Sequence, residues 1–274
     1  MRLVTFRDPH GDSRVGRLDG DRVIELAAPT MLAWLSGEGH EPVGRDHALA
    51  EVTLLAPVPE PPSVRDFYAF EEHARTGARL LPEAWYEVPV FYFSTPASIL
   101  GPGEPVRRPD GCLLLDFELE IAAVIGEDGG IAGFTLFNDW SARDIQGREM
   151  TVGLGPAKGK DFGTSLGPWL ATPDELPYRD GRLMLEATVT VNGEVVARCD
   201  ASRQHWTWPQ IVAHAARNTS LRPGDVLGSG TLGGGCLLEL NAARGAAGEH
   251  RWLEPGDTVA LETPGLGRLE TLVV

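Results

Sequence analysis

The sequence predicts an α+β fold rich in β-structure, with an antiparallel or mixed sheet and few helices. Short apolar or alternating segments recur along the chain, whose 33 glycines and 21 prolines favour turns between strands. One segment, residues 208–218, has its apolar residues at helical spacing. With 274 residues, 42% of them hydrophobic, the chain can bury an ordinary globular core.

The sequence indicates individual strands, turns and a helical turn. RLVTF and DRVIEL are short strands on either side of a glycine-containing turn, and TMLAWL forms a helical turn. LRPGDVLGSG turns back into a strand after the helix, and Asn192-Gly193 fits the type I′ turn of a hairpin. By length and by β-branched or apolar content, further strands are expected at PVFYF, LLLDFELEIAAVIG, GFTLF, LMLEATVTV, EVVARC, CLLEL and TVALET.

A proline-rich segment divides the chain into two expected domains. Pro57–Pro62 (PVPEPP) forms a rigid boundary, so residues 1–56 are predicted to be a small N-terminal β-rich domain. Residues 57–274 are then the main domain.

Charge and cysteine content narrow the class of protein. The net charge of −15 repels phosphate backbones, so nucleic acid is not expected as a partner. The chain has neither a basic amphipathic stretch nor an apolar run of about 18 residues, and its start lacks a signal-peptide core. Three widely spaced cysteines argue against a disulfide framework. We therefore expect a soluble cytoplasmic protein that binds no membrane.

An apolar segment that carries three acids is the most informative feature. In LLLDFELEIAAVIG, successive side chains of a strand alternate between faces, so Asp116, Glu118 and Glu120 project the same way. Clustered carboxylates repel one another and are costly to bury, and a hard cation with oxygen ligands removes both problems. The alternative interpretation is the solvated face of an edge strand.

A second acidic position follows the next expected strand. Asp139 comes directly after GFTLFN, in a position to complete a carboxylate site. Ser141 and Asp144 are interpreted as the N-cap and third residue of a helix. Helix capping does not explain why Asp139 lies so close to Arg143 and Gln146.

Other polar residues allow both ordinary and functional interpretations. Lys160, in a Gly- and Lys-rich segment, is either a fixed cation for an oxyanion or an ordinary surface lysine. His73, beside two glutamates, is by itself more typical of an exposed helical position. Glu239 is an acid inside an apolar strand, and the Gly-rich loop before it can approach a ligand through its backbone.

Together, these segments resemble the fumarylacetoacetate hydrolase family. From about Asp66 to the C-terminus, the motifs DFELE, NDWSARDIQ, GKDFGTS, SGT and LLEL stand in the family's order. The resemblance implies a β-roll core of mixed sheets and a homodimer. It does not extend to the N-terminal unit, which matches only in being small, and the aromatic residue typical of fumarylacetoacetases is replaced here by Met150.

The resemblance also implies roles for individual residues. A divalent metal, Mg²⁺ or Ca²⁺ with Mn²⁺ as a further candidate, would be bound by Asp66, Glu118, Glu120 and Asp139. Asp116 would not be a ligand. The base that activates water would be His73, oriented by Glu239. Developing negative charge would be stabilised by Arg143, Gln146 and Lys160. The substrate would be contacted by Tyr68, Tyr92 and Thr231.

The implied activity is hydrolysis of a carbon–carbon bond next to a ketone in a β-diketo acid of the fumarylacetoacetate or acylpyruvate type. Two alternatives stay open. One is a 2-oxo acid decarboxylase, isomerase or hydratase of the same superfamily. The other is a non-catalytic small-molecule-binding domain that retains the metal site. Residues 66–89 mix charged, glycine and aromatic residues and are predicted to close over the site as a lid.

Overall fold

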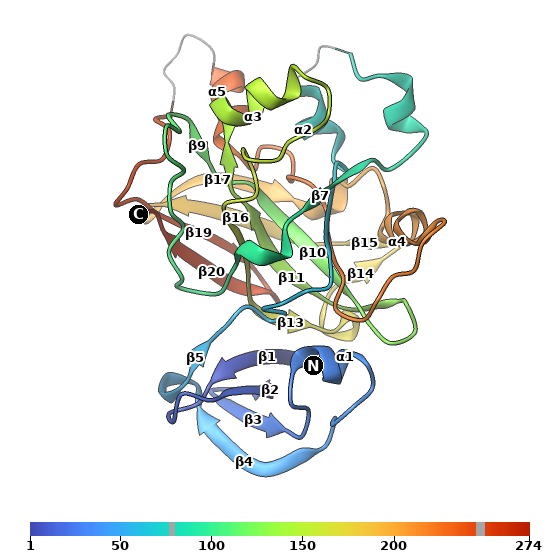
Figure 1. Cartoon of the computed structure of the whole chain (residues 1–274), viewed down its shortest axis with the longest axis vertical. Coiled ribbons are helices and arrows are strands. Elements are labelled where there is room, and N and C mark those ends of the chain that lie inside the picture. The colour runs from blue at the N-terminus through green and yellow to red at the C-terminus, as the bar shows by residue number, and fades with distance from the viewer. Residues whose placement is uncertain (77–79, 245–249) are drawn as a thin grey trace.

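The N-terminal residues form one end of a large sheet (Figure 1). The computed structural model describes residues 1–76, 80–244 and 250–274. Thr30 caps a short helix, its side chain accepting the backbone N–H of Ala33 at 3.1 Å. The elements of this part are β1 (Arg2–Arg7), β2 (Ser13–Asp19), β3 (Arg22–Leu26), α1 (Met31–Leu35), β4 (Pro42–Ala48) and β5 (Thr53–Leu54). The strands expected at RLVTF and DRVIEL and the helical turn are confirmed, whereas β2 and β4 were not predicted.

The central strands continue the same sheet. They are β6 (Val64–Phe67), β7 (Phe91–Ser94), β8 (Ile99–Leu100), β10 (Leu119–Ile125), β11 (Ile131–Asp139), β13 (Thr164–Ala171) and β18 (Val226–Gly228). The main order is β4-β3-β2-β1-β13-β11-β10-β18-β6-β7, with β5 beside β1 and β8 beside β13. Two pairs, β18–β6 and β13–β8, are parallel and the other pairs are antiparallel. The predicted mixed, β-rich α+β fold is confirmed.

A second sheet of four strands packs beside the first, in the order β17-β16-β19-β20. These strands are β16 (Glu186–Val191), β17 (Glu194–Asp200), β19 (Thr258–Thr263) and β20 (Gly267–Leu272). Asn192 and Gly193 join β16 to β17 with φ of 52° and 82°, which confirms the type I′ turn. Two short ribbons pair β9 (Leu115–Asp116) with β12 (Ser141–Ala142) and β14 (Tyr178–Arg179) with β15 (Arg182–Leu183).

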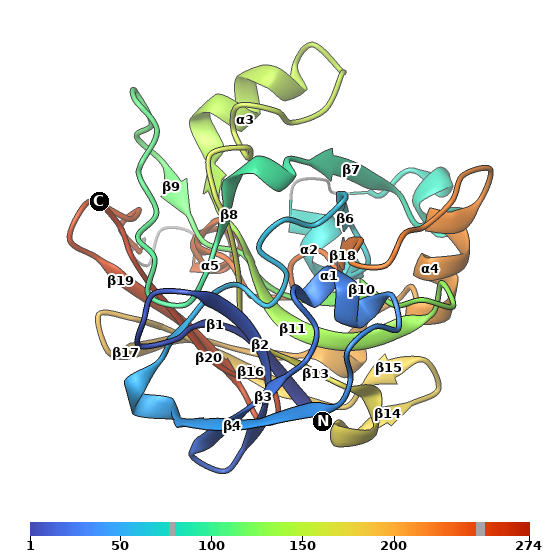
Figure 2. The ribbon, with the colours of Figure 1, turned by 60° about the horizontal axis from the view of Figure 1, so that its bottom comes forward.

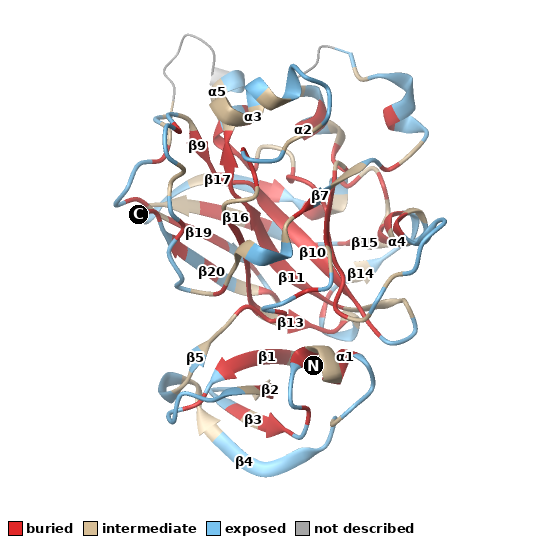
Figure 3. Ribbon diagram, in the orientation of Figure 1, coloured by how far each residue is buried: buried red, intermediate tan, exposed pale blue. Residues whose placement is uncertain are grey.

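The core lies on both faces of β10, every residue of which is buried (Figure 3). Ile121, Ala123 and Ile125 join the apolar cluster on one face, and Ala122 and Val124 join the cluster on the other. Burial on both faces explains the almost continuous apolar run in this segment. An acid within that run is therefore unusual and has to be explained.

After α1, the described α-helices are α2 (Glu71–Thr76), α3 (Arg143–Met150), α4 (Trp208–Ala216) and α5 (Leu237–Arg244). Helix α4 confirms the helix predicted from apolar spacing. Helices α2, α3 and α5 gather at the end of the molecule opposite β1–β4 (Figure 1), and Figure 2 shows α3 on the side of the molecule away from β4. None of the helices in the described ranges is long and apolar enough to cross a membrane.

Three local predictions were wrong. CLLEL begins helix α5 and is not a strand, because a short apolar run has no distinguishing period. Ser141 lies in β12 and Ala142 is the N-cap of α3. The segment LLLDFELEIAAVIG is not one strand, since β9 ends at Asp116 and β10 starts at Leu119. The strand β13 was missed because it contains Gly167-Pro168, which are poor strand formers.

Candidate metal centre and active site

Four carboxylates meet inside the large sheet. Asp66 lies on β6, Glu120 on β10, Asp139 at the end of β11, and Glu118 just before β10. Strands β11, β10, β18 and β6 are consecutive neighbours, so the sheet brings the four acids together. One ligand-capable oxygen of each lies within 4.8 Å of the others, and all four residues are buried.

The free oxygens of this cluster fit a divalent cation. Within the described residues, Glu120 Oε1 and Asp139 Oδ1 are buried without a hydrogen-bond partner. A Cβ on Gly228 would lie 2.5 Å from Asp66 Oδ1, so the strand between the acids must lack a side chain there. The backbone N–H of Gly230 donates to Glu120 Oε2 at 3.0 Å and to Asp66 Oδ1 at 3.2 Å. An all-oxygen set of this kind suits Mg²⁺, Ca²⁺ or Mn²⁺.

Without a metal, two of the acids must share protons. Burial, followed by the charge of Asp139, raises the pKa of Asp66 well above its ordinary value. Burial and the charge of Asp66 do the same to the pKa of Glu120. Burial also disfavours the charge of Glu118, but Arg143 and Lys160 outweigh it and hold its pKa below the ordinary range.

Lys160 is a buried part of the site and not a surface lysine, which corrects the ordinary interpretation of its segment. Its ammonium group donates to Glu118 Oε2 and Asp139 Oδ2. Burial alone would lower the pKa of Lys160, but the charges of Asp139 and Glu118 raise it. Tyr92 donates its hydroxyl to the same Asp139 oxygen at 2.7 Å.

Arg143, the first residue of α3, pairs with two acids of the segment around the start of β10. Its guanidinium lies 2.8 Å from Asp116 Oδ2 and 2.8 Å from Glu118 Oε1. Its Nη1 donates to Gln146 Oε1 at 3.2 Å. Asp116 is therefore outside the four-carboxylate cluster, although strand alternation placed it on the same face as Glu118 and Glu120.

His73 forms a buried pair with Glu239. His73 Nδ1 hydrogen-bonds Glu239 Oε1, while Nε2 lies 3.7 Å from Glu118 Oε1. The histidine is 8% exposed, so the interpretation as a surface residue of a helix is wrong. Because a carboxylate accepts at Nδ1, this nitrogen carries the proton and the lone pair of Nε2 faces the carboxylate cluster. Glu239 also accepts the backbone N–H of Gly234.

Of the predicted substrate contacts, Tyr68 lies against this pair, whereas Tyr92 binds Asp139. The ring of Tyr68 meets the His73 ring edge to face at 5.3 Å, and burial raises the pKa of Tyr68 to about 12. Thr231 is buried, and its hydroxyl has no hydrogen-bond partner among the described residues. A buried hydroxyl without a partner is available to bind a ligand. The described parts of the predicted lid carry Asp66, Tyr68 and His73, while residues 77–79 lie outside the described ranges.

Several contributors were missed from the sequence. Gly228 leaves space for the Asp66 carboxylate, Gly230 donates its backbone N–H to Asp66 and Glu120, and Cys236 Sγ lies 3.8 Å from Glu239 Oε1. Only the Gly-rich composition of the loop gave a signal, and it indicated close approach to a ligand, not to the carboxylates. The other contacts join segments that are distant in sequence.

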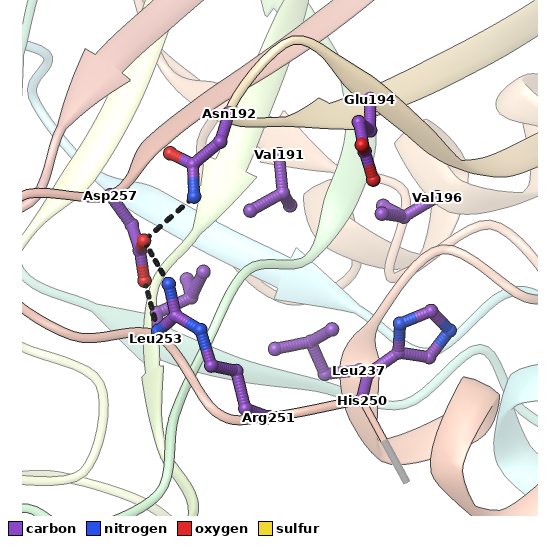
Figure 4. A pocket seen from close by; sticks show the side chains of 9 residues that line it. All are labelled: Val191, Asn192, Glu194, Val196, Leu237, His250, Arg251, Leu253 and Asp257. Carbon is purple, nitrogen blue, oxygen red and sulfur yellow. Dashed lines mark hydrogen bonds and ion pairs between the residues drawn. The ribbon is translucent and has the colours of Figure 1, made fainter. Parts of the chain in front are cut away.

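A surface pocket lies apart from this site (Figure 4). It is lined by Val191, Asn192, Glu194, Val196, Leu237, His250, Arg251, Leu253 and Asp257. Asp257 accepts hydrogen bonds from Asn192 and Arg251, so these polar groups bind each other. None of the predicted site residues is in its lining.

A mixed sheet that buries four carboxylates next to two cations and a His–Glu pair defines an enzyme-like site with room for a metal. The chain belongs to the fumarylacetoacetate hydrolase family. Residues 63–274 match the family model described as fumarylacetoacetate (FAA) hydrolase C-terminal. Residues 1–57 match a second model, described as Rv2993c-like, N-terminal.

Individual relatives place the chain among the enzymes of this superfamily. It is 32% identical to a fumarylacetoacetase of Arabidopsis thaliana over 73% of this chain and 65% of the plant enzyme, so it spans less than two thirds of that relative. It is similar to the structure of 5-carboxymethyl-2-hydroxymuconate delta-isomerase from Mycobacterium smegmatis, with a TM-score of 0.76, 28% identity and coverage of 100% and 99% of the two chains. The fold also matches maleylpyruvate hydrolase from Sphingobium sp. SYK-6, solved with manganese(II) ion and pyruvate, with a TM-score of 0.69, 19% identity and the same coverage.

Proposed function

We propose that this chain is a metal-dependent hydrolase that cleaves a carbon–carbon bond in a β-diketo acid of the fumarylacetoacetate or acylpyruvate type. The observation that supports this most is the His73–Glu239 pair, whose basic nitrogen faces a buried carboxylate cluster. A pure binding domain needs no oriented base. We further propose that it works as a cytoplasmic homodimer on a small keto acid, without nucleic acid or membrane partners.

The metal would be held by Asp66, Glu118, Glu120 and Asp139, and when bound it would act as a Lewis acid on the substrate carbonyl. His73 takes a proton from water at Nε2, and the water oxygen attacks the carbonyl. Glu239 keeps the imidazole in the required tautomer and stabilises its protonated form.

Cations next to the cluster supply the remaining chemistry. Lys160 stays charged and donates to negative charge that develops as the carbon–carbon bond breaks. Arg143 and Gln146 lie on the first turns of α3 and are joined by a hydrogen bond, so they can share this role. One donor of this type contributes about 3 kcal/mol to lowering the barrier.

A second candidate is an isomerase or decarboxylase of a 2-oxo acid. The observation in its favour is the full-length similarity to the mycobacterial delta-isomerase. Such reactions need an enolate to be stabilised but no activated water. Lys160 and the carboxylate cluster would then suffice, and the His73–Glu239 pair would matter less.

One experiment separates the two functions. Acylpyruvates and 2-oxo acids are assayed with Mg²⁺ and with excess chelator, for the parent and for His73→Ala. We expect the variant to lose ~100-fold or more in hydrolysis, the scale of general base catalysis, and to retain most isomerase or decarboxylase activity. Glu239→Gln should lose less and show a changed pH profile. The exposed His10→Ala serves as the control. Hydrolysis by His73→Ala at the parent rate would exclude the proposed role of the histidine.

A further inference from the structure

A second set of metal-ligand side chains lies behind the proposed base. Cys236 Sγ is 4.0 Å from His73 Nδ1 and 3.8 Å from Glu239 Oε1. One ligand atom from each of the three residues lies within 4.8 Å of the others, and all three are buried. The set contains sulfur, nitrogen and oxygen, in contrast to the all-oxygen cluster on the other side of the imidazole.

We infer that His73, Cys236 and Glu239 form an inhibitory site for a borderline or soft divalent ion, of which Zn²⁺ and Cd²⁺ are the representatives. Such ions favour thiolate and imidazole ligands, whereas Mg²⁺ and Ca²⁺ favour oxygen. Zinc bonds of about 2.0–2.3 Å in a tetrahedral site separate the ligand atoms by roughly 3.5 Å. The two distances to Cys236 are close to this value, and only the hydrogen-bonded His73 and Glu239 atoms must move apart.

Binding at this site replaces two protons. The ion takes the position of the Nδ1 proton between His73 and Glu239, and the Cys236 thiol gives up its proton as the metal–sulfur bond forms. The thiol proton leaves to solvent, whereas the ring regains at Nε2 the proton that it loses at Nδ1, so one proton is released in total. The three protein ligands leave a fourth position for water, as in other open zinc sites.

Loss of the base follows from the tautomer of the imidazole. With a metal ion on Nδ1, the neutral ring carries its only proton on Nε2, the nitrogen that lies 3.7 Å from Glu118. That nitrogen then has no lone pair to accept a proton from water. Inhibition therefore requires no displacement of an ion from the four-carboxylate cluster. This consequence rests on the proposed role of His73, but the binding itself does not.

The site has an approach of its own from the surface. Glu239 lines a cavity of about 600 Å³ together with Glu72, Arg75, Gly233 and Gly234. Of the three ligands, Glu239 lines this cavity, between α2 and α5, and none of the four clustered carboxylates does. An ion that enters from this side therefore meets Glu239 first and does not pass the carboxylate cluster.

Direct binding is measured first, with no need for turnover. The protein is first stripped of bound metals and then supplied with excess Mg²⁺. It is titrated with Cd²⁺, and the ultraviolet absorption of the cadmium–thiolate bond is followed. We expect one saturable band in the parent and in Cys199→Ser, whose cysteine is equally buried but outside the trio. Cys236→Ser and His73→Gln should lose the band. Circular dichroism and thermal unfolding establish whether each variant is folded. If Cys236→Ser does not fold, His73→Gln provides the test.

Inhibition is measured next, with Zn²⁺ in the hydrolysis assay. We expect the half-inhibitory concentration to be independent of added Mg²⁺ and to rise at least ~10-fold in Cys236→Ser, since even outer partners of a metal change its affinity on this scale.

A cadmium band that persists in folded Cys236→Ser, or no band in the parent, would overturn the inference. Relief of zinc inhibition by Mg²⁺ would also overturn it, since the ion would then act in the carboxylate cluster. A cadmium band without any hydrolase activity would instead refute only the proposed function.

Discussion

Two lysines in the segment AKGK, residues 157–160, show how residue-scale context decides function. Lys158 has a side chain 76% exposed and pairs with Asp161, whereas the side chain of Lys160 is 4% exposed and bonds Glu118 and Asp139. The two positions are only two residues apart. The two lysines differ because the fold leaves Lys158 in solvent and buries Lys160 between Glu118 and Asp139.

The pair provides a matched test of charge stabilisation. Lys160→Met should lower the hydrolytic rate by about 100-fold or more, the usual loss on removing one donor to a developing oxyanion. Its affinity for Mg²⁺ should not fall, because the lost ammonium competes with the metal for Glu118 and Asp139. Lys158→Met should keep the parent rate. Steady-state kinetics and metal titration of both variants give the measurement, and equal rates in the two variants would contradict the role of Lys160.

At the scale of elements, Asp116 joins the segments that carry the proposed chemistry. Its carboxylate accepts the backbone N–H of Leu237 at 2.7 Å and of Leu238 at 3.1 Å, at the start of the helix that carries Glu239. The same carboxylate binds Arg143 at the start of α3. One acid thus fixes the positions of two helices relative to the carboxylate cluster.

Asp116→Asn should weaken both connections. The amide oxygen still accepts, but the charge that holds Arg143 and the helix N-terminus is lost. We expect the free energy of unfolding to fall by about 2–3 kcal/mol, the scale of hydrogen bonds to charged groups. Denaturant unfolding measures this. Asp200→Asn, which removes an exposed acid that accepts one backbone N–H from Ser202, is the control and should cost less than about 1 kcal/mol. Equal losses in both variants would show that Asp116 has no special role.

For the whole molecule, the large sheet sets the electrostatic balance. It places acids from three distant parts of the sequence on neighbouring strands, in a chain whose net charge is already −15. The raised pKa values of Asp66 and Glu120 mean that the folded, metal-free protein holds more protons than the unfolded chain above about pH 4. Its stability must therefore fall as the pH rises towards the folded-state pKa values. Glu118, whose pKa is lowered, has already made its full contribution above that pH.

A divalent ion should reverse this trend, because it replaces the shared protons. With chelator, the melting temperature should be lower at about pH 8 than at about pH 6, and the gain on adding Mg²⁺ should be larger at the higher pH. A hundredfold excess over the dissociation constant stabilises by about 2.7 kcal/mol. Glu120→Gln should reduce the pH dependence, and the exposed Glu127→Gln should not. A thermal gain that is larger at low pH would contradict the metal assignment.

Much of the fold could be predicted from local pattern. Alternation, apolar runs and the Asn192-Gly193 turn identified half of the strands of the large sheet, namely β1, β3, β7, β10, β11 and β18, and β16, β17 and β19 of the second sheet. Apolar spacing identified α4. The failures have local causes. An apolar run without a period hid α5, and a glycine and a proline inside β13 hid that strand. The motif order was sufficient to indicate the family, which the family models then confirmed.

The sequence by itself determined the composition of the site: acids in apolar strands, a histidine beside glutamates, and a lysine among glycines. It did not determine which of these residues are buried together. The pairing of β6 with β18 and of β10 with β11 brought residues 66, 118, 120 and 139 into one cluster, and α2 and α5 brought His73 to Glu239 and Cys236. Burial, hydrogen-bond partners and pKa depend on neighbours that are far away along the chain, and these neighbours exist only in the folded molecule.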